Sequence, residues 1–106
     1  MLQFLKKLFA KTNSEELNTA INNGAFLVDV RTTQEFASGH VKGSVNIPLN
    51  KIESHLKELK SKKNMVVFCR SGNRSSQAKS ILEKNGFTNV TNGGTWQNVN
   101  QILKSK

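Results

Sequence analysis

Short, continuously apolar runs alternate along this chain with segments in which apolar residues recur every three or four positions. The continuous runs predict four buried strands, at residues 26–30, 44–47, 65–68 and 87–91. The helical spacing predicts five helices, at residues 14–21, 32–37, 50–60, 75–85 and 96–103. Strands that are apolar throughout and alternate with helices are typical of a parallel sheet covered on both faces. The pattern therefore predicts an α/β domain with helices on both faces of a parallel sheet.

The ends of several predicted helices carry local sequence signals. Thr12 and Thr32 are each followed three residues later by a glutamate, which is the spacing of a capping box. Asn50, with Glu53 three residues on, is expected to cap the third helix. Gly24 is expected to end the first helix, because glycine readily adopts the backbone conformation that follows a helix.

The composition fits one small domain with an uneven charge. The chain has 106 residues, with 16 Lys and Arg against 7 Asp and Glu, so its formal net charge is +9. Residues 51–106 hold eleven of the basic and three of the acidic side chains. No aromatic residues interleave with the lysine-rich run 56–63, so bases would have nothing there on which to stack. We interpret the run as a solvated helix end, and we do not expect DNA as a partner.

The first residues form a separate segment in this interpretation. Residues 1–11 are predicted to be an amphipathic leader whose apolar face holds Leu2, Leu5, Leu8 and Phe9. Two lysines cut its apolar stretch too short for a secretory signal, and no small-residue cleavage site follows. No run in the chain approaches the roughly 20 apolar residues of a membrane-spanning helix. We expect the leader to dock or fray rather than bind a membrane, residues 12–106 to form one domain, and the protein to be cytoplasmic.

Cys69 is the single cysteine, and this count excludes several kinds of site. The chain cannot form an internal disulfide, a cysteine-rich zinc site or a two-cysteine redox motif. With only two histidines as well, a metal site is not expected, and no cofactor is predicted.

The segment around Cys69 nevertheless favours chemistry at the sulfur. Residues 69–74 join the most apolar strand to the start of a helix, and ligands of open α/β sheets bind at such strand ends. A short loop before a helix directs backbone N–H groups inward, while Arg70 and Arg74 add two positive charges and Gly72 lets the chain curl. Each of these features stabilises an anion, so we predict a Cys69 thiolate with a lowered pKa that acts as a nucleophile. A merely structural buried cysteine would leave the arginines, the glycine and the helix start unexplained.

Four segments of the chain resemble the single-domain rhodaneses, which are sulfurtransferases. The segment 69–75, Cys-Arg-Ser-Gly-Asn-Arg-Ser, is similar to the family's active-site loop. The family's first signature is resembled by residues 27–31, 35–36 and 39–41. Residues 46–49 match the stretch that follows it, and residues 92–94 with Trp96 resemble the family's closing glycine-glycine-tryptophan segment. The resemblance covers about residues 14–103 in the family's order. It departs at Lys42, where the family commonly has proline, in a loop away from the cysteine.

The resemblance implies a fold, a reaction and a set of substrates. The sheet would have about five parallel strands, the fifth being a short stretch near residues 9–12. Cys69 would take the outer sulfur of thiosulfate or a similar donor and become a persulfide, which a thiol or cyanide then discharges. The expected partners are thus a small sulfur-containing anion and a thiol acceptor, with an acceptor protein in a sulfur relay as a further possibility. The substrate-binding residues would be those of the loop, Arg70, Ser71, Gly72, Asn73 and Arg74.

Three further residues are expected to support the loop. Asp29 and Arg31, at the end of a neighbouring strand, could pair with Arg74 or with each other. Glu35 could pair with Arg74 on the same argument. We therefore expect Arg74 to be held by a carboxylate and Arg70 to be freer. Trp96 is interpreted as a core residue rather than a substrate platform.

Two other function classes remain alternatives. A Cys-dependent phosphatase or arsenate reductase of the same fold is one, but those phosphatases resemble Cys-x5-Arg, whereas Cys69 and Arg74 form Cys-x4-Arg. Phe68 also stands where the phosphatase motif often has histidine. A non-catalytic binding module with a rhodanese-like fold is the other, and the presence of Cys69 argues against it.

Overall fold

A computed structural model of the chain describes residues 15–105. The expected leader at 1–11, the first residue of the capping box at Thr12 and the suggested fifth strand near residues 9–12 lie outside the described residues.

The described residues form a parallel sheet of four strands. They are β1 (Phe26–Asp29), β2 (Val45–Asn46), β3 (Met65–Cys69) and β4 (Val90–Thr95). Their order in the sheet is β2-β1-β3-β4, and every neighbouring pair is parallel. All residues of β3 are buried, because this strand is paired on both sides and covered on both faces. The predicted parallel α/β sheet is confirmed.

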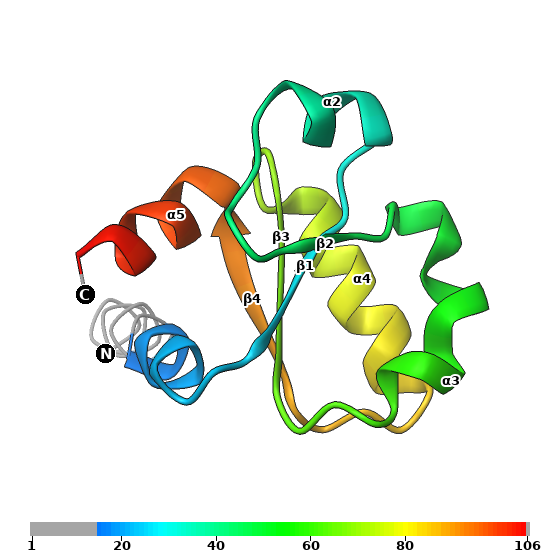
Figure 1. Cartoon of the computed structure of the whole chain (residues 1–106). Coiled ribbons are helices and arrows are strands. Elements are labelled where there is room, and N and C mark those ends of the chain that lie inside the picture. The colour runs from blue at the N-terminus through cyan, green and yellow to red at the C-terminus, as the bar shows by residue number, and fades with distance from the viewer. Residues whose placement is uncertain (1–14, 106) are drawn as a thin grey trace, which may run out of the picture.

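Helices cover the two faces of this sheet and one of its ends (Figure 1). They are residues 15–22, α2 (Thr33–Ser38), the 3-10 helix η1 (Leu49–His55) that runs into α3 (Leu56–Leu59), α4 (Asn73–Lys84) and α5 (Trp96–Lys104). Residues 15–22 and α5 lie on one face, and α3 and α4 lie on the other, while α2 sits beyond the carboxyl ends of the strands.

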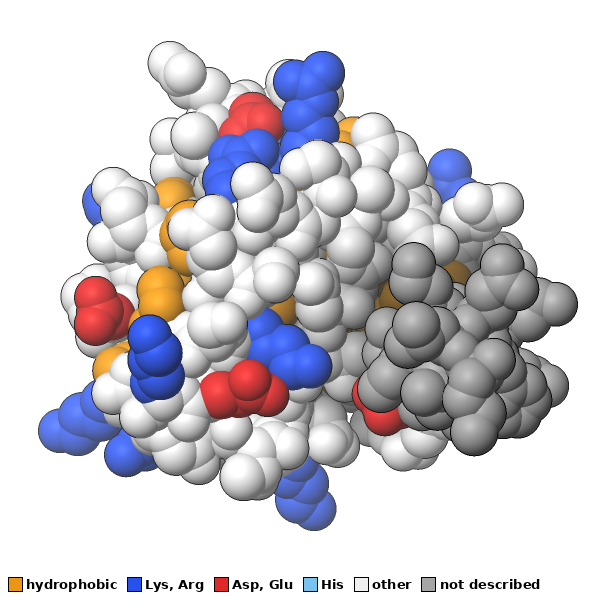
Figure 2. Space-filling view, turned by 180° about the vertical axis from the view of Figure 1, so that it is seen from behind, with side chains coloured by type: hydrophobic (Ala, Val, Ile, Leu, Met, Phe, Trp, Pro, Cys, Tyr) orange, Lys and Arg blue, Asp and Glu red, His pale blue; other side chains and the backbone are white. Residues whose placement is uncertain are grey.

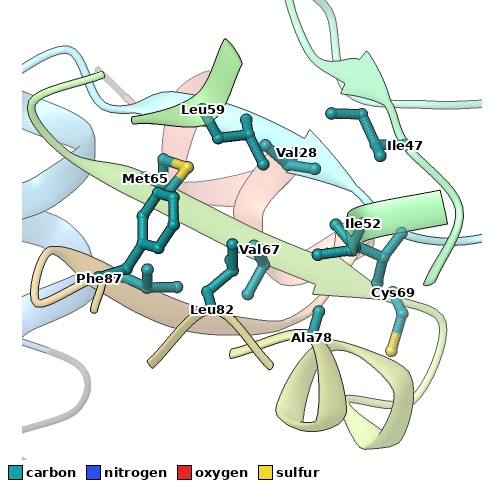
Figure 3. Packing of buried hydrophobic residues seen from close by; sticks show 12 residues of the cluster. Val28, Ile47, Ile52, Leu59, Met65, Val67, Cys69, Ala78, Leu82 and Phe87 are labelled. Atoms are coloured by element: carbon teal, nitrogen blue, oxygen red, sulfur yellow. The ribbon is translucent and has the colours of Figure 1, made fainter. Parts of the chain in front are cut away.

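Two apolar clusters form the core, one on each face of the sheet. On the face covered by α4, residues Met65, Val67 and Cys69 of β3 join the larger cluster, shown in Figure 3. On the other face, Val66 and Phe68 pack in the second cluster with helical residues 15–22 and α5. The alternation of a strand therefore decides that the Cys69 side chain points toward α4.

The helix predicted at residues 50–60 is wrong in its first half, which is the 3-10 helix η1. The turn begins after Pro48, whose carbonyl accepts the Lys51 N–H at 2.8 Å, and no side chain caps it. Ser54 Oγ donates to the Lys51 carbonyl, and Nδ1 of His55 also hydrogen-bonds to it, at 2.7 and 2.9 Å. These side chains occupy the carbonyl that a regular α-helix would pair with the His55 N–H, so the α-helix starts only at Leu56.

The strand predicted at residues 87–91 is displaced toward the C-terminus. Phe87 still closes α4, since its N–H donates to the Leu82 carbonyl at 3.1 Å, and the strand begins only at Val90. Gly93 and Gly94 precede the last helix, as expected, and both lie within β4. Gly93 is buried, and a Cβ atom there would lie 2.7 Å from Val99 and 2.9 Å from Val66, so this crossing of strand and helix requires glycine.

Basic side chains do not gather into one stripe on the face seen in Figure 2. They lie scattered over that surface, with acidic side chains among them. None of the helices described is long and apolar enough to cross a membrane.

The packing at Gly93 generates a stability prediction. We expect Gly93→Ala to lower the free energy of unfolding by about 2 kcal/mol, because the new methyl group meets two stiff valine side chains. Urea denaturation would measure the change. Ser80→Ala, on the exposed side of α4, serves as the control and should lie within about 0.5 kcal/mol of the unmodified protein. Equal stability of the two variants would contradict this account of the crossing.

Candidate active site

The Cys69 side chain occupies the carboxyl end of the central strand. It is fully buried as a residue, and its sulfur points away from the packed side chains of the cluster toward the start of α4 (Figure 3). The strand fixes the position of Cys69, and the loop at 70–72 turns back over its sulfur.

Backbone N–H groups of this loop and of α4 converge on the sulfur. The Gly72 N–H donates to Sγ at 3.0 Å, and the Ser75 N–H donates to it at 3.4 Å. The Ser75 hydroxyl lies 3.5 Å from Sγ. Burial raises the pKa of Cys69, but hydrogen bonds from the Ser75 side chain and from backbone N–H groups of Ser75, Ser71 and Gly72 lower it by more. The pKa of the thiol therefore lies below its ordinary value, as the sequence predicts.

Gly72 makes this convergence sterically possible. Its φ of +95° lies in the left-handed region, which side chains with a Cβ rarely adopt. A Cβ at this position would also lie 3.5 Å from the Cα of Gly94, so the loop and the end of β4 approach each other closely. Glycine at this position lets the chain reverse and aim its N–H at the sulfur.

Arg74 pairs with Glu35. Of the two carboxylates that the sequence offered as its partner, Asp29 and Glu35, it is therefore Glu35 that holds it. Nη1 and Nη2 of Arg74 donate to Oε1 and Oε2 of Glu35 at 2.7 and 3.0 Å. Glu35 is also the capping-box residue of α2, since its Oε1 accepts the Thr32 N–H at 3.0 Å. The bonds from Arg74 and Thr32 lower the pKa of Glu35 to about 2, and those from Glu35 raise the pKa of Arg74. One carboxylate thus joins the start of α2 to the start of α4.

Asp29 and Arg31 pair with each other. Arg31 Nη2 donates to Asp29 Oδ2 at 2.7 Å, and Arg31 Nε lies 3.0 Å from both carboxylate oxygens. The same Nη2 donates to the Gly39 carbonyl at 2.6 Å, and the guanidinium lies 4.7 Å from the centre of the Trp96 ring. Both charged residues are buried, so this pair braces the end of β1 against the segment after α2 and the start of α5. Trp96 is half-buried and packs against the second cluster, which places it partly in the core.

The three other loop residues predicted to bind substrate are exposed. The side chains of Arg70, Ser71 and Asn73 face solvent, and no hydrogen bond or ion pair from them to the described residues is found. Arg70 is thus the freer of the two arginines, as expected. Gly72 and Arg74 complete the predicted loop, and all five residues lie at the same end of the sheet.

Two residues of the site were not predicted as such from the sequence. Ser75 contributes its N–H and its hydroxyl to the surroundings of the sulfur, and Asn92 Oδ1 accepts a hydrogen bond from that hydroxyl at 2.7 Å. The position of Ser75 at the first turn of a helix, six residues after the cysteine, was the available signal. Asn92 lies in the segment 92–94 that resembles the family, but the sequence gives no signal of its contact with Ser75, because only the strand pairing brings it to the loop.

The pair of Glu35 and Arg74 makes a prediction for stability against pH. Because the pKa of Glu35 is lowered in the folded chain, the carboxylate stabilises the fold above pH 4.5, and this contribution disappears as the pH falls toward 2. We expect Glu35→Gln to cost about 1 kcal/mol of unfolding free energy at pH 7 and much less at pH 2. Urea denaturation across this range would measure the difference. Glu83→Gln on the exposed side of α4 is the control, and a loss that is independent of pH would contradict the role of the charge.

Comparison with known proteins places the chain in a family. The Rhodanese-like domain family matches residues 13–95. PspE of Escherichia coli strain K12, named a thiosulfate sulfurtransferase, is 38% identical over 69 residues, which are 63% of this chain and 66% of PspE. A putative mitochondrial thiosulfate sulfurtransferase of Schizosaccharomyces pombe is 40% identical over 94 residues, covering 76% of this chain and 66% of that protein.

A solved structure agrees with these sequence matches. The human single-domain sulfurtransferase TSTD1 is 30% identical to this chain, with a TM-score of 0.65. The match covers 87% of this chain and 93% of the TSTD1 chain. The match spans slightly less than two thirds of the length of the two curated relatives above. The family model covers most of the chain and agrees with the fold, so the chain belongs to the rhodanese-like domain family, as its sequence predicts.

Proposed function

We propose that this chain is a rhodanese-type sulfurtransferase in which Cys69 carries the transferred sulfur as a persulfide. The observation that carries the proposal is the convergence of two backbone N–H groups on one buried sulfur, at 3.0 and 3.4 Å. Donors of this kind are preorganised for negative charge and need no rearrangement when it develops. The sulfurtransferases among the relatives support the same reaction class.

In the first step, the Cys69 thiolate attacks the outer sulfur of thiosulfate or a similar donor. A new S–S bond forms between Sγ and that sulfur, the bond from the outer sulfur to the sulfonate sulfur breaks, and sulfite leaves with the electron pair. Cys69 becomes a persulfide whose negative charge lies on the terminal sulfur. The lowered pKa of Cys69 supplies the thiolate without a side-chain general base.

In the second step, an acceptor thiolate attacks the terminal sulfur of the persulfide. The acceptor gains that sulfur, the S–S bond to Sγ breaks, and the Cys69 thiolate is regenerated with the electron pair. Cyanide would accept the sulfur in the same way. An acceptor protein that presents a cysteine would make the chain one member of a sulfur relay.

The two arginines have different roles in this proposal. Arg70 is exposed beside the nucleophile, where it attracts an anionic donor. Arg74 positions the start of α4 through its bidentate bond to Glu35, and its charge also favours the thiolate.

The same geometry argues against the phosphatase alternative. A loop-closing arginine that binds phosphate needs its N–H groups free for the substrate oxygens. Here Nη1 and Nη2 of Arg74 each give one N–H group to Glu35, so two of its five N–H groups are not available to a substrate. The short Cys-x4-Arg loop also directs its N–H groups at the sulfur of Cys69 itself rather than at a larger group above it.

Intact mass spectrometry tests the persulfide. After incubation with thiosulfate and removal of the excess, the protein should gain the mass of one sulfur atom and lose it again on addition of cyanide. Because Cys69 is the single cysteine, the site of the adduct follows from the mass alone. Cys69→Ser is the matched control. The same mass gain in that variant, or no gain in the unmodified protein, would overturn the proposal.

Steady-state kinetics test the separate roles of the arginines. Arg70→Ala should raise KM for thiosulfate about threefold at low salt and less at high salt, because it removes a steering charge. Arg74→Ala should lower kcat about tenfold, cost about 1 kcal/mol of stability and raise the Cys69 pKa measured by alkylation, since it releases the start of α4 and removes a positive charge.

Lys84→Ala removes the same charge at the far end of α4 and is the control for both variants. The same kinetic profile and salt dependence for Arg70→Ala and Arg74→Ala would refute the division of roles.

A further inference from the structure

The Ser75 hydroxyl has three polar neighbours, but it can donate a hydrogen bond to only one of them at a time. Its oxygen lies 2.7 Å from Asn92 Oδ1, 3.1 Å from the Gly72 carbonyl oxygen and 3.5 Å from the Cys69 sulfur. A hydroxyl carries a single hydrogen, which can be given fully to one acceptor at a time. The direction of that hydrogen therefore affects whether Ser75 stabilises a charge on the sulfur.

The backbone fixes which way the Asn92 amide faces. The Gly94 N–H lies 2.9 Å from the same Asn92 oxygen, and an N–H group can only donate. The atom between Gly94 and Ser75 must accordingly be the amide oxygen and not the amide nitrogen. Ser75 is then the donor in its shortest contact, and its hydrogen points toward Asn92.

A Ser75 hydrogen that points to Asn92 is compatible with a Cys69 thiol but not with a Cys69 thiolate. When the Ser75 hydrogen points to Asn92, a lone pair of the Ser75 oxygen faces Sγ. The Ser75 oxygen can then accept a hydrogen bond from the Cys69 thiol. When the thiol loses its proton to solvent, the same lone pair faces a negative sulfur, and the favourable arrangement requires the hydroxyl hydrogen to turn from Asn92 to Sγ.

We propose that Asn92 is a positioning residue for Cys69, which competes with the sulfur for the single hydrogen of the Ser75 hydroxyl. It holds that hydrogen while Cys69 is a thiol and yields it when the sulfur becomes an anion. No covalent bond forms or breaks in this exchange, because the hydroxyl only rotates about its C–O bond.

The sheet places Asn92 for this competition. Asn92 lies opposite Val67 in the register of β3 and β4, and a register shift directly after Val67 brings Gly94 opposite Phe68. Irregularities of this kind often redirect a side chain next to an active site. Ser75 is fully buried and Asn92 is half-buried, so water competes little for the hydroxyl.

The consequence for sulfur transfer rests on the proposed function. Once the terminal sulfur of a persulfide carries the charge, Sγ is neutral and the hydrogen can return to Asn92. When the acceptor removes that sulfur, the charge comes back to Sγ and the hydroxyl turns again. Asn92 would thus affect both steps through Ser75, without touching the substrate.

The ion pairs at this end of the sheet do not involve Asn92, and Glu16 and Lys79, which line the same hollow as Asn92, belong to neither pair. Asp29 and Arg31 pair with each other, Glu35 and Arg74 pair with each other, and Arg70 is exposed. Substitution of Asn92 removes none of these pairs, so a change at the sulfur would not come from their loss.

The test is the pH dependence of Cys69 alkylation by iodoacetamide, measured without any sulfur donor. Asn92→Ala should lower the alkylation midpoint by about half a pH unit, because Ser75 then donates to the thiolate without competition from its nearest acceptor. Asn92→Asp should raise it by about one pH unit, because a carboxylate holds the hydrogen more firmly and adds negative charge. Asn92→Asp also keeps an acceptor for the Gly94 N–H, so it is the variant expected to retain the fold.

The Ser75→Ala background separates the competition from other effects. In the Ser75→Ala background, Asn92→Ala should leave the alkylation midpoint unchanged. Asn92→Asp should cause a smaller shift there, which comes only from the repulsion between the added carboxylate and the thiolate. Asn98→Asp on α5 adds the same charge without a bond to Ser75 and is the control.

Two outcomes would overturn the inference: shifts of equal size with and without the Ser75 hydroxyl, or midpoints that both Asn92 variants leave unchanged. Because no sulfur donor is present, shifts of the expected kind would support the inference even if the protein transferred no sulfur. If the alkylation midpoints shift as expected but thiosulfate adds no sulfur to the protein in the mass test, the result counts against the proposed function alone.

Discussion

The candidate site depends on backbone N–H groups directed at a sulfur that the sheet holds in place. Cys69 belongs to the most buried strand, so its sulfur cannot move far without disturbing the core. Gly72 reverses the chain directly after it, and the first turn of α4 adds the Ser75 N–H. The donors come from main chain whose position follows from packing, which is why the arrangement exists before any substrate arrives.

Two ion pairs hold the surroundings of this arrangement, and they act on different elements. The buried pair of Asp29 and Arg31 joins the end of β1 to the Gly39 carbonyl and to the Trp96 ring. The half-exposed pair of Glu35 and Arg74 joins the cap of α2 to the first turn of α4. The first braces the wall of the site, whereas the second reaches the loop itself, so only the second is suited to influence the sulfur directly.

The glycines of β4 show how the outermost strand of the described sheet can contribute to the site. Gly93 lets α5 pack against the sheet where a methyl group would not fit, and Gly94 lies beside Gly72 of the loop. Between α4 and this strand, Asn92 meets the Ser75 hydroxyl. The close approach of backbone to backbone thus brings a strand-borne amide within reach of the residue that touches the sulfur.

The sequence alone determined the features that depend on neighbouring residues. The capping box at Thr32 was predictable because its two partners lie three residues apart, and the anion-stabilising loop was predictable because strand, glycine, arginines and helix start follow one another. The same local evidence misplaced β4 and the first half of the 50–60 helix, where glycines and side chains bonded to a carbonyl outweigh the apolar pattern.

Only the tertiary structure decided which charged and polar groups meet across the chain. Glu35 and Arg74 are 39 residues apart, and Ser75 and Asn92 are 17 apart. Asp29, Glu35 and Arg31 were all plausible partners in the loop region, because residue type and spacing say nothing about distances between separate elements. Their pairing follows from the order of the strands and the packing of α2 and α4 at one end of the sheet, and these are properties of the folded chain.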